Sequence, residues 1–119
     1  MSTFKDLLIW QKAMNLVTDI YKSTKSFPKD EQFGLTSQIR RSSISIPSNI
    51  AEGYGRHGKN DYLKFLHISL SSLFEMQTQI EIAKNIDYLN ENNFKILYED
   101  SRELERMLVS FINKIKDRK

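Results

Sequence analysis

The 119-residue chain contains no cysteine, only 4 glycines and 2 prolines, and no long hydrophobic run. The absence of cysteine excludes disulfide scaffolds, thiol nucleophiles and Cys-ligated metal sites, and it is typical of proteins from a reducing compartment. The longest purely apolar run, 7–10, is far shorter than the roughly 20 residues that span a bilayer, and no secretory signal pattern opens the chain. We therefore expect a cytoplasmic protein with no membrane contact, folded as a single domain over residues 1–119.

The charge is modest overall but unevenly distributed. The formal net charge is +3, and residues 1–64 carry 10 basic and 6 acidic side chains, whereas residues 65–119 carry 8 and 9. The first half therefore supplies the positive field. This imbalance permits contact with an anionic partner such as nucleic acid, although a surface that only keeps the domain in solution explains it equally well.

Glycine and proline fall at two places, 27–28 and 53–58, and a polar stretch at 87–90 forms a third break. The segments between these breaks are much longer than strands, and their apolar residues have helical spacing. We predict an all-α fold with four helices at roughly 5–25, 30–54, 60–86 and 91–117. Short connections between long helices favour an antiparallel up-down-up-down four-helix bundle.

The first and fourth helices each show an apolar stripe. In the first, Trp10, Met14, Val17 and Tyr21 recur at alternating spacings of four and three. In the fourth, a near-continuous seam faces a surface crowded with charged residues, and the seam comprises Leu97, Ser101, Leu104, Leu108, Phe111 and Ile115. The predicted N-caps of the third and fourth helices are Asn60 and Asn90.

The second and third helices carry more apolar surface than one small bundle needs. Beside a stripe at 35, 39, 46 and 50, the second helix has another that is displaced around its axis. The third helix likewise has isoleucines at 68, 82 and 86 that point away from its main stripe. Because large exposed apolar patches usually mark interfaces, we expect a homo-oligomer. The expected interface residues are Phe33, Ile44, Pro47, Ala51 and Ile68.

Pro47 falls inside the second helix. It lacks an amide hydrogen and crowds the preceding turn, so we expect this helix to bend near 43–47. The hydroxyls of Ser42, Ser43 and Ser45 are candidates for bonding the carbonyls that the bend frees.

Residues 35–41 and 46–53 closely resemble the characteristic motif of a bacterial four-helix-bundle family that is often encoded in intervening sequences within 23S ribosomal RNA genes. These segments read Leu-Thr-Ser-Gln-Ile-Arg-Arg and Ile-Pro-Ser-Asn-Ile-Ala-Glu-Gly, and the residues at 10–13 and 27–28 also match short motifs of the family. Where many relatives have small apolar residues after the paired arginines, this chain has Ser42 and Ser43. The resemblance covers essentially the whole chain.

This resemblance implies a closed ring of bundles, expected to be a homopentamer, with no established enzymatic activity. The family is also similar to the accessory bundle protein of diversity-generating retroelements, which partners a reverse transcriptase and binds nucleic acid. It therefore implies self-association, and it makes structured RNA or DNA, or a nucleic-acid-processing protein, the expected further partner. The resemblance is more informative about fold and assembly than about function.

Groups that could act together in catalysis are few. The two histidines, His57 and His67, both lack the Glu three positions earlier that di-iron bundles use, so we predict no metal site and no cofactor. We expect His57 in a loop and His67 packed or hydrogen-bonded. The glycines at 53–58 follow a helix and lack the ending of a nucleotide-binding loop, so we expect Gly53 and Gly55 to end a helix in a left-handed conformation. We assign no catalytic residue and expect the protein to have no enzymatic activity.

Five cationic side chains lie close together in the sequence and could contact nucleic acid: Arg40, Arg41, Arg56, Lys59 and Lys64. Arg40 and Arg41 could instead form salt bridges across a subunit interface, because arginine suits both roles and both lie beside apolar residues. Two hypotheses follow. One is an oligomeric RNA- or DNA-binding accessory protein, and the alternative is a protein-protein interaction scaffold with no nucleic-acid contact.

Overall fold

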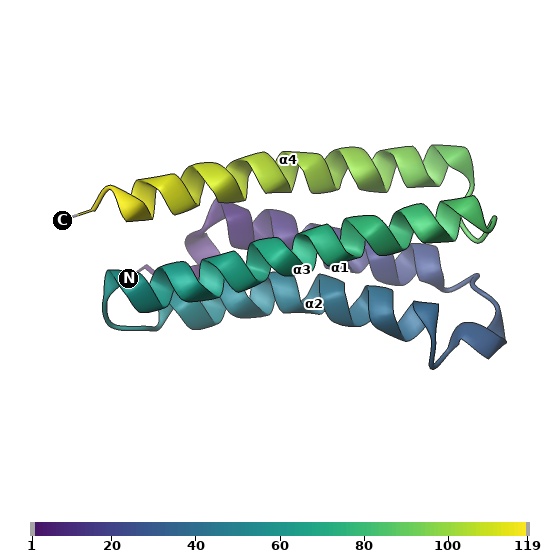
Figure 1. The fold of residues 1–119 in the computed structure, drawn as a ribbon, viewed down its shortest axis with the longest axis horizontal. Helices are drawn as coiled ribbons and strands as arrows, with labels where there is room; N and C mark the ends of the chain where they lie inside the picture. The colour runs from purple at the N-terminus through teal and green to yellow at the C-terminus, as the bar shows by residue number, and fades with distance from the viewer. Residues whose placement is uncertain (1, 119) are drawn as a thin grey trace.

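The computed structural model describes residues 2–118 and shows four long helices packed side by side (Figure 1). Short 3-10 turns, η1 (Phe4–Asp6) and η2 (Lys29–Glu31), precede the first two. The helices are α1 (Leu8–Thr24), α2 (Leu35–Tyr54), α3 (Lys59–Asn85) and α4 (Glu91–Lys116). Each helix packs on its neighbours in the chain and α1 also packs on α4, which confirms the predicted all-α four-helix bundle. No helix within residues 2–118 is long and apolar enough to cross a membrane.

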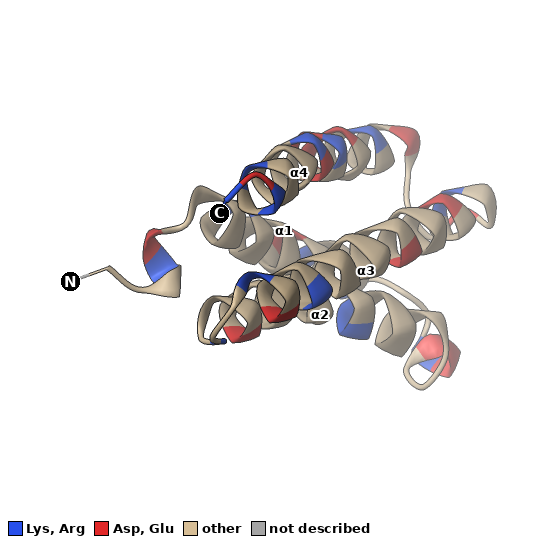
Figure 2. Cartoon of the chain, turned by 60° about the vertical axis from the view of Figure 1, so that its left-hand side comes forward, with Lys and Arg blue, Asp and Glu red and all other residues tan. Residues whose placement is uncertain are grey.

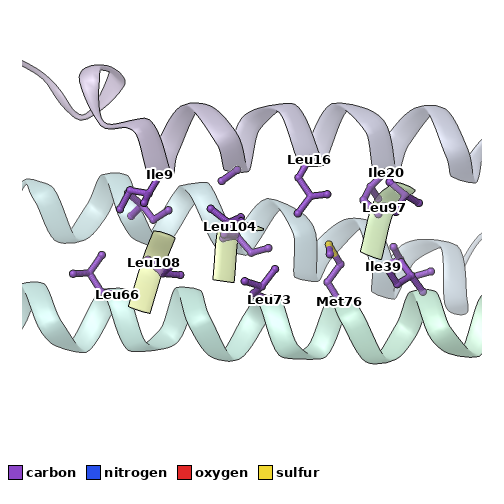
Figure 3. Packing of buried hydrophobic residues seen from close by; sticks show 14 of the residues in the cluster. Ile9, Leu16, Ile20, Ile39, Leu66, Leu73, Met76, Leu97, Leu104 and Leu108 are labelled. Carbon is purple, nitrogen blue, oxygen red and sulfur yellow. The ribbon is translucent and has the colours of Figure 1, made fainter. Parts of the chain in front are cut away.

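The core runs along the axis of the bundle, where layers of leucine and isoleucine from all four helices meet (Figure 3). Leu66, Leu73 and Ile80 of α3 have no exposed surface, and neither do Leu104 and Leu108 of α4. These layers confirm the seam predicted for the fourth helix, although Phe111 is only partly buried. Burying a leucine or isoleucine stabilises the fold by about 1.5–3 kcal/mol, so this core is the main source of stability.

The stripe predicted for the first helix lies outside the core. The buried residues of α1 are Ile9, Ala13, Leu16, Ile20 and Thr24, which lie about 100° around the helix from the predicted stripe. Met14 is 40% exposed, and Trp10 and Val17 are half-buried beside α2. Two apolar stripes therefore run along α1, and only one of them packs inside the bundle.

Helix α2 begins at Leu35, five residues later than predicted. The backbone at Gly34 is not helical, with φ −112° and ψ −118°. Glu31 caps the helix that follows, because its Oε1 accepts a hydrogen bond from the Leu35 amide at 3.1 Å. At α4 the predicted cap is confirmed, because the Asn90 side chain accepts the Asn93 amide at 2.7 Å.

The N-cap predicted for α3, Asn60, was wrong. Gly58 occupies the N-cap position with φ 92°, and Asn60 lies inside the first turn.

Gly53 and Gly55 do not end α2 in a left-handed conformation, contrary to the prediction. Gly53 is inside α2, and Gly55 at the C-cap has φ −80° and ψ −2°. A Cβ atom at Gly53 would lie 2.9 Å from the Cβ of Phe65 and 3.0 Å from Cδ1 of Tyr62. The physical reason for glycine at 53 is therefore the close approach of α3.

A polar seam of hydroxyl and amide side chains joins α2 to α3. The Ser42 hydroxyl donates to Oε1 of Gln79 at 2.7 Å, and the Ser45 and Ser72 hydroxyls are 2.8 Å apart. Ser69 donates to the carbonyl of Ile46 at 2.9 Å. Serine is small, so these contacts allow the two helices to pack closely while every hydroxyl keeps a partner.

Pro47 lies within α2 without ending the helix. The carbonyl that loses its amide donor to this proline belongs to Ser43, four residues earlier. The Ser43 hydroxyl donates to the carbonyl of Arg40 at 2.8 Å. The Ser42 hydroxyl, whose one hydrogen is directed at Gln79, lies 3.0 Å from the carbonyl of Ile39. The prediction that these serines bond the freed carbonyl was therefore wrong, because the hydroxyls of Ser42, Ser43 and Ser45 have other partners.

Candidate functional site

The α2–α3 loop and the end of α4 bring cations together at one end of the bundle. Figure 2 shows Lys and Arg where α3 begins and where α4 ends, with a separate basic segment on α2. Lys59, in the first turn of α3, donates from Nζ to the carbonyls of Lys116 and Arg118 at 3.1 and 2.8 Å. Because these carbonyls lie at the end of α4 and just beyond it, the lysine charge also offsets the negative end of that helix dipole.

Arg56 and Lys64 lie beside this end, and both approach the ring of Phe65. The Arg56 guanidinium is 3.1 Å from the carboxylate of Glu52 and 4.9 Å from the centre of the Phe65 ring. Lys64 Nζ is 5.9 Å from the same ring centre. Arg56, Lys59 and Lys64 are all exposed, so three of the five predicted cations are available to a partner at this end.

A cavity of 340 Å³ opens at the same end, and its charged lining residues are all cations. It is lined by Tyr54, Arg56, Gly58, Lys59, Tyr62, Ile115 and Arg118. The Tyr62 ring packs edge-on against Tyr54 and Phe111, with ring centres 6.4 and 5.9 Å away. Burial raises the pKa of Tyr62 to about 12, so its hydroxyl stays neutral and can donate. The same hydroxyl is buried without a hydrogen-bond partner.

Arg40 is occupied within the chain. Its guanidinium lies over the Tyr21 ring at 4.4 Å, and Nε donates to the Thr24 hydroxyl at 2.9 Å. A further contact joins a terminal guanidinium nitrogen to the Tyr21 carbonyl at 3.4 Å. Arg40 thus links α2 to the last turns of α1, with Nε and one terminal nitrogen directed at α1.

Arg41 is exposed on the other side of α2, remote from the basic end, which is the end of the bundle that carries Arg56, Lys59, Lys64 and Arg118. Roughly 20 Å of helix separates it from Tyr54, where α2 ends. It lines a 480 Å³ cavity together with Glu75 and Phe33, which is 89% exposed. Glu75 lines the same cavity, so this surface carries charge of both signs. The structure therefore divides the five predicted cations into separate groups.

The two histidines lie in different elements of the bundle. His57 lies in the α2–α3 loop as predicted, whereas His67 is exposed on α3, contrary to the expected packing. Within residues 2–118 no three His, Asp or Glu side chains are placed to hold a metal ion.

An apolar groove of 320 Å³ runs between α1 and α2. Its lining residues are Trp10, Met14, Val17, Ile44, Pro47, Ser48 and Ala51. Ile44 is 41% exposed at its edge, and Ala51 is half-buried. Pro47 is buried by the chain itself, so of the predicted interface residues it offers the least surface to a second copy.

A second apolar surface lies on α3 and faces a different direction. Ile68, Ile82 and Ile86 are 39%, 44% and 46% exposed. They project from the outer side of α3, since their positions lie within about 40° of one another around the helix and opposite the buried Leu66. Helix α1 packs on α2 and α4, so α3 lies diagonally across the bundle from it. The isoleucine ridge, comprising Ile68, Ile82 and Ile86, and the apolar groove thus belong to different sides of the molecule.

Arg118 also lies at this end of the bundle, although it was not among the five predicted cations. It is 54 positions beyond Lys64, the last cation of the predicted group, so proximity in sequence gave no hint. The antiparallel arrangement supplied a usable signal, because it places the end of the fourth helix beside the start of the third. A basic residue just after a C-terminal helix is therefore expected near the α2–α3 loop.

Comparisons with known proteins agree with this architecture. The family model of the 23S rRNA-intervening sequence protein matches residues 5–110. A crystal structure from Bacteroides thetaiotaomicron, described as a protein of unknown function from the S23 ribosomal protein family, superposes with a TM-score of 0.80 at 25% sequence identity. The match covers 88% of this chain and 98% of that one. No curated protein matches the sequence. On the extent of the family match, the chain belongs to the 23S rRNA-intervening sequence protein family.

Proposed function

We propose that this protein acts without enzymatic activity, as a subunit of a homo-oligomer that binds the backbone of structured RNA or DNA. The observation that carries the proposal is the apolar groove between α1 and α2, which leaves Met14 and Ile44 about two-fifths exposed. Apolar surface of this kind is typical of an interface. A second copy of the chain is the proposed occupant of the groove.

The isoleucine ridge on α3 supports a particular mode of assembly. Because the groove and the ridge are different surfaces on different sides of the bundle, a contact between them is head-to-tail. Such contacts form a ring when the rotation between subunits closes. Five copies is the expected number, and it comes from the family resemblance alone.

Assembly also gives the basic end its proposed role. One copy offers Arg56, Lys59 and Lys64, which is too few phosphate contacts for useful affinity at physiological salt. A ring repeats these cations in every subunit, so binding gains from avidity. We leave Arg40 out of the proposed contact because it is half-buried and its guanidinium packs on α1, away from the other cations. Arg41 belongs to a separate surface with Glu75.

The assembly part is tested by light scattering on the wild type, Ile44→Asp and Val109→Asp. Val109 is a matched control, since it is 40% exposed on α4 and Ile44 is 41% exposed on α2. An aspartate at 44 would place an unpaired charge in the interface, so we expect a monomer with the helical circular dichroism retained. Val109→Asp should keep the wild-type mass. A wild-type monomer at micromolar concentration would contradict the proposal.

The nucleic-acid part is tested by titrating labelled RNA and DNA hairpins at two salt concentrations. We expect binding that weakens steeply with salt, because phosphate contacts release counterions. Binding should be lost in Arg56→Ala/Lys59→Ala, because two phosphate-contacting cations are removed. It should also be lost in the dissociated Ile44→Asp variant, because a monomer does not repeat the cations. If the intact oligomer does not bind at low salt, the scaffold hypothesis, in which the ring contacts only proteins, replaces this one.

A further inference from the structure

We infer that the cavity between the first turn of α3 and the last turn of α4 is a binding site for a phosphomonoester group. The inference rests on the proposed function in so far as a nucleic-acid strand supplies that group at its end. It adds a defined subsite to what is otherwise a surface of exposed cations.

The first support is the Tyr62 hydroxyl. Tyr62 is 91% buried, and its hydroxyl has neither solvent nor a hydrogen-bond partner. Side chains in a helix lean toward its N-terminus, so this hydroxyl is directed at the end of the bundle where Lys59 and Arg118 line the cavity. The proximity of Arg118 counteracts part of the rise that burial causes in the pKa of Tyr62. Buried hydroxyls are nearly always paired, and the exceptions often lie at binding sites.

The second support is that the charged side chains lining the cavity are all donors. Arg56, Lys59 and Arg118 are its charged lining residues. Glu52 pairs with Arg56 and does not line the cavity. The first turn of α3 adds backbone amides, because Gly58 in the N-cap position has no side chain to accept from them. Helix N-termini of this kind favour anions.

The donors match a phosphomonoester better than a diester of the backbone. A terminal phosphate carries about −1.5 to −2 charges and three strong acceptor oxygens, and these suit three cations and a hydroxyl donor. A backbone diester has one charge and a chain continuing on both sides. The cavity, at 340 Å³, is at the small end of ligand sites. Lys59 and Arg118 are long and exposed, so rotation of their side chains gives the ligand access to the hydroxyl.

The test begins with inorganic phosphate and the full-length oligomer, by isothermal titration calorimetry at constant ionic strength. Tyr62→Phe keeps the ring between Tyr54 and Phe111 and removes only the hydroxyl, so the fold should persist. We expect phosphate affinity to fall about tenfold in Tyr62→Phe and in Arg118→Ala, since each loses a donor to a charged group. Lys95→Ala, an exposed substitution near the opposite end of α4, should leave it unchanged. No measurable phosphate binding, or equal affinity in wild type and Tyr62→Phe, would overturn the inference.

Two labelled hairpins of the same sequence, with and without a 5′-phosphate, then distinguish the source of the group. Tighter binding of the phosphorylated strand by wild type, with the difference lost in Tyr62→Phe, identifies a strand end as the ligand. If inorganic phosphate binds in the Tyr62-dependent manner but the two strands bind equally, the ligand is a free phosphate compound. If both hairpins bind with steep salt dependence while phosphate does not bind, the proposed function stands and this subsite is refuted.

Discussion

The Tyr88 hydroxyl donates a 2.9 Å hydrogen bond to Oε2 of Glu31, which lies 57 residues earlier in the chain. The other carboxylate oxygen of Glu31 accepts the amide of Leu35 at the start of α2. The Tyr88 ring also packs on Phe27, with ring centres 5.4 Å apart. One carboxylate therefore caps α2 and fastens the α1–α2 connection to the α3–α4 turn, at the end of the bundle opposite the basic cavity.

This contact predicts a dependence of stability on alkaline pH. The hydrogen bond to Glu31 raises the pKa of Tyr88 above its ordinary value of 10.0. Because the pKa is raised in the folded state, this hydrogen bond stabilises the fold fully below about pH 10. The stabilisation is lost as the pH rises through the folded-state pKa. Wild type should therefore be more stable than Tyr88→Phe at neutral pH, and the gap should close at high pH. Thermal melts of both proteins from neutral to alkaline pH measure this difference in stability. A difference that does not change with pH would contradict the stabilising role of the Tyr88–Glu31 hydrogen bond.

The capping role of Glu31 predicts different effects for two substitutions. Glu31→Ala removes the acceptor for the Leu35 amide and should destabilise the protein by about 1 kcal/mol, as the loss of a helix cap does. Glu31→Gln keeps a carbonyl oxygen at the same reach and should cost less. Urea denaturation of the two variants measures the difference. Equal losses would mean that charge, and not the cap, carries the contribution.

The close contact at Gly53 predicts that alanine is harmful there. A Cβ at this position meets Phe65 at 2.9 Å, so Gly53→Ala should destabilise by about 1–3 kcal/mol despite the better helix propensity of alanine. Gly55→Ala is the matched control, because its nearest neighbour would be the Glu52 carbonyl oxygen at 3.7 Å. We expect Gly55→Ala to change stability by less than about 1 kcal/mol. Denaturant midpoints that rank the two variants in the reverse order would refute this account.

Arg40 and Arg41 are adjacent, but we expect substitutions at them to act differently. Arg40→Met loses the hydrogen bond to Thr24 and the contact with the Tyr21 ring, and should cost about 1–2 kcal/mol of stability. Arg41→Met changes an exposed side chain and should stay within about 0.5 kcal/mol. Neither should weaken nucleic-acid binding as Arg56→Ala/Lys59→Ala does. A large loss of binding in folded Arg40→Met would place Arg40 in the interface after all.

The predictability of this fold from sequence depended on whether a helix has one apolar stripe or two. Helix α4 has a single stripe, and Leu104 and Leu108 were correctly placed in the core. Helix α1 has two stripes about 100° apart, one through Leu16 and one through Val17. Periodicity identified a helix there but could not tell which of the two stripes faces the core of the bundle, because that choice is made by packing between distant segments.

The same reasoning explains what was missed at the basic end. Arg56, Lys59 and Lys64 are close in sequence and in space, so the cluster was partly predictable. Arg118 reaches the cavity only through the antiparallel packing of α4, and the unpaired Tyr62 hydroxyl is a property of the folded core. Sequence patterns report which residues share a helix face, and not which polar groups are left without partners.

The polar seam between α2 and α3 also sets the register of that helix pair. Isoleucine and leucine stripes would tolerate a slide of one helical turn, since apolar side chains pack in many arrangements. The pairing of Ser42 with Gln79 and of Ser45 with Ser72 would not survive such a slide, and each broken pair would leave a buried polar group unsatisfied. The register set by these pairs also places Gly53 opposite Phe65. The seam therefore determines how far the α2–α3 loop extends, and with it the distance between Lys59 and the end of α4.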